Sequence, residues 1–94
     1  MSTVGYVKTI EVEALTEQHN YAVIRLPERK YPGVVVQGDS LSILVANLRR
    51  GVEQLRDGQY DDGLDEINEV LEILEGAQHG YETALDAHSI PRPY

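Results

Sequence analysis

Cysteine, tryptophan and phenylalanine are absent from this sequence of 94 residues, and methionine occurs once. Without cysteine the chain cannot form disulfide bonds, thiolate zinc sites or a cysteine nucleophile, and it suits a reducing compartment. No stretch approaches the roughly 20 apolar residues of a membrane span, and the first residues lack the basic and apolar segments of a secretory signal. We therefore expect a cytoplasmic protein that makes no contact with membranes.

Basic residues are scarce as well: 8 Lys and Arg stand against 16 Asp and Glu, for a net charge of -8. The imbalance lies in one half, because residues 1–56 carry seven bases and six acids (+1) and residues 57–94 carry one base and ten acids (-9). Such a surface repels nucleic-acid phosphates and attracts basic partners. The alternative is that the acid only keeps the protein in solution.

The chain has the length of one domain, so we expect a single hydrophobic core over residues 1–94. Alternating apolar and polar residues predict a strand at about 4–14, and a segment rich in β-formers predicts a second at about 20–27. A run of three valines after Gly33 predicts a third strand at about 33–37, buried on both faces.

Apolar residues at helical spacing predict helices at about 40–57 and 61–88. Asp39 or Ser40 is placed to cap the first helix, and Gly58 to end it. The tail at 89–94 contains two prolines and is expected to lie extended over the surface. The order predicts an α+β fold, in which a three-stranded antiparallel sheet (β-β-β-α-α order) carries two antiparallel helices on one face.

Two apolar patterns are expected to hold the helices together. In the second helix, residues three and four apart form a heptad seam, while Gly76 and Gly80 mark places for a bend. The stripe of the first helix comprises Leu41, Leu44, Val45, Leu48, Val52 and Leu55, and the seam of the second comprises Leu64, Ile67, Leu71, Leu74, Gln78, Tyr81, Leu85 and His88.

A row of acidic side chains beside this seam is the strongest functional feature. At 100° per residue the carboxylates share one flank of the second helix, and no Lys or Arg on that helix neutralises them. Compensation is therefore expected from a basic partner. The predicted partner-binding residues are Asp65, Glu69, Glu72, Glu75, Glu82 and Asp86.

A metal site is the less favoured interpretation of the same flank. Glu75, His79 and Glu82 have the i, i+4, i+7 spacing of bundle metal ligands, but the polar residues of the facing helix are mostly Arg. We therefore predict no metal and no cofactor.

Other chemistry has little support. Ser40 and Ser42 lack the strand-turn context of a nucleophile, and no glycine-rich phosphate loop is present, so no catalytic residue and no enzyme are predicted. A small basic and aromatic patch is the only candidate for nucleic-acid contact, which the net charge disfavours. It comprises Tyr21, Arg25, Arg29, Lys30 and Tyr31.

The stretch from about residue 25 to 55 resembles the core of the HicB antitoxin family, in which a Pro-Gly, a short strand and a Gln-Gly-Asp-Thr motif precede a helix. The matching positions are Pro32, Gly33, Gln37, Gly38, Asp39 and Ser40. The resemblance implies a partial ribonuclease-H-like sheet without catalytic carboxylates, and neutralisation of a small basic ribonuclease toxin. The whole chain also resembles small uncharacterised bacterial domains with an RLPxRxYPGVxxQGDSL core.

After the first helix the sequence departs from HicB, because a long acidic helix stands where that family has a further strand and often a DNA-binding segment. We predict a bacterial immunity protein or antitoxin that covers the active site of a basic nuclease toxin without itself touching nucleic acid. The alternative is a regulatory or structural homo-oligomer, such as a homodimer, that associates through Val70, Ile73 and Ala84.

Overall fold

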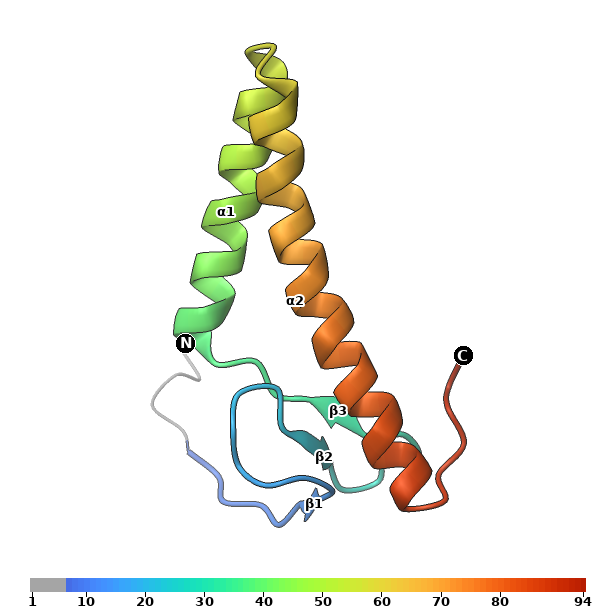
Figure 1. Cartoon of the computed structure of the whole chain (residues 1–94). Helices are drawn as coiled ribbons and strands as arrows, with labels where there is room; N and C mark the ends of the chain where they lie inside the picture. Colours follow the sequence, from blue (N-terminus) through green and yellow to red (C-terminus); the bar gives the residue numbers. More distant parts are fainter. Residues whose placement is uncertain (1–6) are drawn as a thin grey trace.

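The computed structural model describes residues 7–94 and shows a small sheet from which a helical hairpin projects (Figure 1). The strands are β1 (Glu13–Ala14), β2 (Val23–Arg25) and β3 (Gly33–Val34), in the order β1-β2-β3 with both pairs antiparallel. The helices are α1 (Gly38–Arg56) and α2 (Tyr60–Ala87). The predicted α+β class and β-β-β-α-α order are therefore confirmed.

The strands are shorter than the sequence predicts. Residues 4–6 of the first predicted strand lie outside the described residues, and from 7 onward only Glu13–Ala14 pairs with β2. The prediction that Val34, Val35 and Val36 are buried on both faces is wrong, since each is more than one-third exposed. The reason is that β3 is an edge strand and α1 rises away from it (Figure 1).

The core lies where the C-terminal part of α2 packs on the sheet. Val23 of β2 and Tyr81, Ala84 and Leu85 of α2 form a buried cluster, with Leu15 and Ile90 packed against it. The hydroxyl of Tyr81 donates a hydrogen bond of 2.9 Å to the carbonyl oxygen of Pro32, which ties α2 to the loop before β3. The sheet therefore packs mainly against α2 rather than against both helices.

The helix boundaries agree with the sequence within two residues. α1 begins at Gly38, with Gln37 as the N-cap, so Asp39 and Ser40 lie in the first turn and do not cap it. At its other end the amides of Gly58 and Gln59 bond to the carbonyls of Leu55 and Gln54, and Gly58 adopts φ +80°. This is the Schellman arrangement that the glycine predicts.

α2 is one continuous helix of 28 residues through Gly76 and Gly80. It crosses α1 near the tip of the hairpin, where two glycines bring the backbones together. A Cβ atom on Gly51 would lie 3.1 Å from the carbonyl oxygen of Gly63, and one on Gly63 would lie 2.9 Å from that of Gly51. From this crossing the helices diverge toward the sheet (Figure 1).

The hairpin makes the molecule extended. Its radius of gyration is 17.0 Å, whereas about 12 Å is expected for a compact domain of this length. In the part of the chain that the structure describes, no helix combines the length and apolarity needed to cross a membrane.

Candidate protein-binding surface

Four of the six predicted partner-binding residues form an exposed acidic flank on α2, which we define as Asp65, Glu69, Glu72 and Glu75. They lie on the side of α2 that faces away from α1, because they are roughly 110–170° around the helix from Gly63 and Val70, with Glu75 turned in the opposite sense from the other three. Among residues 7–94 no basic nitrogen lies within 4.0 Å of any of these carboxylates. The structure therefore leaves this part of the predicted site uncompensated.

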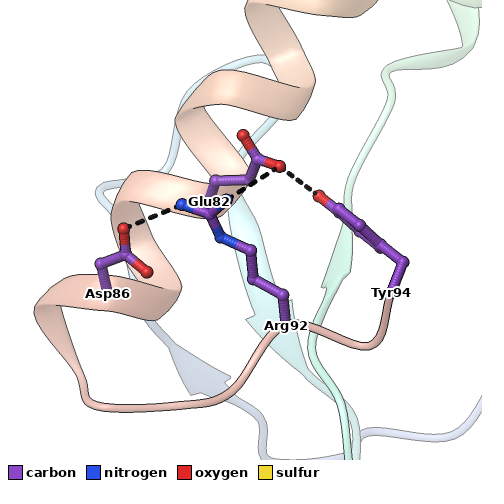
Figure 2. Close-up of polar contacts among 4 residues, drawn as sticks. All are labelled: Glu82, Asp86, Arg92 and Tyr94. Carbon is purple, nitrogen blue, oxygen red and sulfur yellow. Dashed lines mark hydrogen bonds and ion pairs between the residues drawn. The ribbon is translucent and has the colours of Figure 1, made fainter.

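The other two predicted residues are compensated within the chain. Figure 2 shows Arg92 of the C-terminal tail between Glu82 and Asp86, with N–O distances of 3.5 and 3.1 Å. The hydroxyl of Tyr94 donates a 2.9 Å hydrogen bond to Glu82. The hydrogen bond with Asp86 raises the pKa of Arg92 above its usual value. The expectation that a partner must neutralise these two acids is therefore wrong, because the tail folds back over α2.

Arginines of α1 are divided between two sides of the hairpin. Arg50 bridges the helices through a 3.1 Å ion pair with Glu66. Arg49 and Arg56 are exposed, and within residues 7–94 neither has a carboxylate within 4.0 Å. The hairpin thus carries two uncompensated cations on α1 and an uncompensated acidic flank on α2.

The predicted apolar stripes are only partly buried. Leu44, Val70, Tyr81 and Leu85 are buried as expected. Six other residues, which we call the apolar face, remain 38–52 % exposed. They are Leu41, Val45, Leu48 and Val52 of α1 and Leu64 and Leu71 of α2.

These six side chains lie on one side of the hairpin. In α1 they lie about 80° around the helix from Leu44 and Gly51, which face α2. In α2 they lie about 100° around the helix, in the same sense, from Gly63 and Val70. Because the helices are antiparallel, equal turns in the same sense point to the same side. The apolar side chains of both helices therefore form a single two-helix surface.

The prediction of a self-association surface is wrong for two of its three residues. Val70 is 1 % exposed and Ala84 is 6 % exposed, so neither can meet another molecule, and only Ile73 remains accessible. Val70 faces α1, and Ala84 belongs to the core on the sheet. The error arises because the seam and its neighbours look equally apolar in sequence, and only the crossing angle of the helices decides which of them are covered.

The remaining candidate sites are partly occupied by internal contacts. Arg25 of the basic patch pairs with Glu13 at 2.8 Å and lowers the pKa of that carboxyl, and Lys30 lies 5.3 Å from the ring centre of Tyr31. Ser40 accepts a hydrogen bond of 2.6 Å from Asn20 and so ties the loop after β1 to α1. In the described residues no three His, Asp or Glu side chains are grouped to hold a metal ion.

An apolar groove that the sequence did not indicate lies between β3 and α2. Its volume is about 510 Å³, and its walls come from segments far apart in the chain. It is lined mainly by Tyr21, Val34, Val36, Leu74, Tyr81 and Tyr94. No local motif marks it, because it exists only where the tail, the edge strand and the helix meet.

The sequence profile of DUF6959, described as a family of unknown function, matches residues 7–94. The chain belongs to this family. The DUF6959 match covers the sheet, both helices and the tail, and not only the core around Gly33 and Gly38. No curated protein and no solved structure matches the chain. The resemblance to HicB therefore stays a prediction.

Proposed function

We propose that this protein acts by binding another protein, as an immunity protein or antitoxin that neutralises a basic nuclease toxin. The acidic flank of α2 is the binding element, and its carboxylates take the place of nucleic-acid phosphates against Lys and Arg of the toxin.

The observation that carries this proposal is the contrast along α2. Glu82 and Asp86 receive a counter-ion from Arg92, and Glu66 receives one from Arg50, whereas the acidic flank between them has none within residues 7–94. Like charges that share one helix flank repel one another by a few tenths of a kcal/mol per pair. A partner that supplies cations removes this repulsion, so the flank favours binding to a basic surface.

The position of the flank agrees with such a role. It lies on a rigid helix, away from the core, so that docking requires no rearrangement of the fold. The small size of the chain and its charge of -8 also agree with an inhibitor that covers a cationic active site.

The test is binding to the purified product of the neighbouring gene, measured by calorimetry and by the cleavage of RNA or DNA by that product with and without this chain. The triple variant E69K/E72K/E75K should weaken binding by at least about 100-fold, equivalent to roughly 3 kcal/mol. The matched control E11K/E17K/E53K changes the net charge equally at exposed residues elsewhere and should bind nearly as well as the wild type.

Equal weakening by the two triple variants would show that only the total charge matters and would contradict the proposed site. Circular dichroism of both variants is needed beside the binding data, because a lost helix would remove the flank for a different reason. Unchanged affinity of E69K/E72K/E75K would also overturn the proposal.

The second candidate is a regulatory or structural homo-oligomer. The exposed apolar face favours it, because contiguous aliphatic surface on an elongated monomer marks an interaction site. The residues of that face differ from those expected from the sequence.

A further inference from the structure

Within residues 7–94 no segment covers the apolar face. Its six aliphatic side chains lie between Leu41 and Val52 of α1 and between Leu64 and Leu71 of α2, and each is at least 38 % exposed, although they have the spacing of core residues. A surface of this kind normally meets another apolar surface.

We propose that a second copy of this chain covers the apolar face, giving a symmetric dimer in which two helical hairpins form a four-helix bundle. This inference goes beyond the proposed function and does not rest on it. A symmetric dimer requires a surface that complements itself, and three properties of the hairpin meet this requirement: its extent, its charges and its shape.

The extent of the face suits the centre of a stable interface. The face runs from Leu41 to Val52 of α1, so at 1.5 Å per residue and about 10 Å per helix it measures roughly 18 by 20 Å, or about 360 Å² in projection. A standard interface covers roughly 800 Å² per partner, of which a polar rim supplies the part around the apolar centre. The apolar centre with a charged rim is the composition expected there.

The charges select one of the two symmetric arrangements. With the twofold axis parallel to the helices, α1 of one copy lies on α2 of the other, whereas a perpendicular axis stacks α1 on α1 and α2 on α2. The second arrangement places acidic helix against acidic helix. The first places the arginine-bearing edge of α1 against the acidic edge of α2, and complementary charge favours it.

The axial register agrees with this choice. The crossing sets Gly51 level with Gly63, and the same antiparallel count sets Arg56 about three residues, or roughly 4.5 Å, from the level of Asp61. Within residues 7–94 neither of these two has an ion-pair partner in its own chain. The dimer brings Arg56 of one copy next to Asp61 of the other. Asp65, Glu69 and Glu72 are turned away from the apolar face and stay on the outer surface.

The shape agrees as well. The single chain is extended, with a radius of gyration of 17.0 Å and extents of 48 × 42 × 22 Å. Its hairpin is a single layer of two helices that projects from the sheet (Figure 1). A second hairpin on the apolar face doubles this layer and gives the helices the two-layer packing that stable domains have.

Sedimentation velocity of the full chain tests the dimer. We expect a mass of twice the 10.5 kDa of one chain, retained on dilution to the low micromolar range. V45E and L71E should each shift the mass to that of one chain, with helix content retained in the circular dichroism spectrum. A wild-type mass of 10.5 kDa up to about 100 µM would overturn the proposal.

Ile43 provides the matched control. It is more exposed than any residue of the apolar face and lies on the opposite side of α1. I43E should therefore remain dimeric. If I43E dissociates as L71E does, the effect is one of general destabilisation and the proposed face is wrong.

Charge exchange tests the arrangement independently of the apolar residues. R56D and D61R should each weaken the dimer by about tenfold, because each places like charges side by side between the copies. The combined variant R56D/D61R should restore the wild-type dissociation constant. Additive weakening in the combined variant would overturn the parallel-axis bundle. This experiment uses the chain alone, so its failure leaves the toxin-binding measurement unaffected, and the reverse also holds.

Discussion

The two ends of this molecule are built from the same kinds of residues and are stabilised differently. At the sheet end, Val23, Ala84 and Leu85 are almost fully buried, Tyr81 bonds to the distant Pro32, and Arg92 holds the tail on α2. At the hairpin end the helices contact each other closely at Gly51 and Gly63, and their aliphatic stripes remain half exposed. Apolar periodicity alone therefore does not say which end holds the core.

The largest difference between the ends is expected from truncation of an aliphatic side chain. Leu85→Ala removes a side chain that is 0 % exposed and should lower the free energy of unfolding by about 3 kcal/mol. Ile43→Ala, on the exposed outer side of α1, should change it by less than about 0.5 kcal/mol. Urea denaturation measures both. Similar losses at the two positions would mean that the core is not confined to the sheet end.

Substitution by alanine should change stability in opposite directions at two glycines, because only one of them lies at the helix crossing. Gly51→Ala should destabilise the fold by about 1–3 kcal/mol, because its Cβ would lie 2.9 Å from Cγ1 of Ile67 and 3.1 Å from a backbone oxygen. Gly76→Ala is the control, since a Cβ there meets no atom within 4 Å, and it should stabilise the helix by up to about 1 kcal/mol. Thermal unfolding distinguishes the signs. Stabilisation by both would contradict the close approach of the helices.

Tyr81 tests the polar contact of the sheet end. Tyr81→Phe should cost about 1 kcal/mol, since the carbonyl of Pro32 loses its hydrogen bond. Burial raises the pKa of Tyr81 in the folded protein, so the wild type should lose stability above about pH 10, where the unfolded phenol ionises first. This loss should be smaller in Tyr81→Phe. Denaturation at pH 7 and at pH 10.5 gives the comparison, and an equal loss in the variant would contradict it.

The smallest effect is expected from the tail. Arg92→Ala removes exposed ion pairs with Glu82 and Asp86 and should cost less than about 1 kcal/mol. The cost should fall further at high salt, because exposed pairs are screened. Unfolding in low and high salt measures this. A cost above about 2 kcal/mol at both would show that the tail belongs to the core.

Much of the secondary structure could be predicted from local chemistry. Gly58 marks the end of α1 because only a residue that tolerates φ +80° closes the helix in this way. The 3.6-residue apolar pattern predicts α2, and the sequence alone shows that one flank of this helix is acidic. The strand lengths were predicted poorly, because alternation in residues 7–14 continues beyond the residues that find a partner strand.

The candidate site, like the fold, could be predicted from the sequence only in part. Sequence identifies the acidic flank, but it could not show that Arg92 returns to Glu82 and Asp86, since the tail reaches them only after the chain reverses at the end of α2. It also could not separate Val70, which is buried, from Leu71, which is half exposed.

The amino-acid order by itself determined the helices, the turn between them and the placement of charge on α2, because these depend on neighbours within a few residues. Tertiary structure decided which apolar side chains are covered, since the Gly51–Gly63 crossing turns one side of each helix inward and leaves the adjacent side open. Burial depends on the angle at which two helices meet, and that angle arises from contacts between residues far apart in the chain.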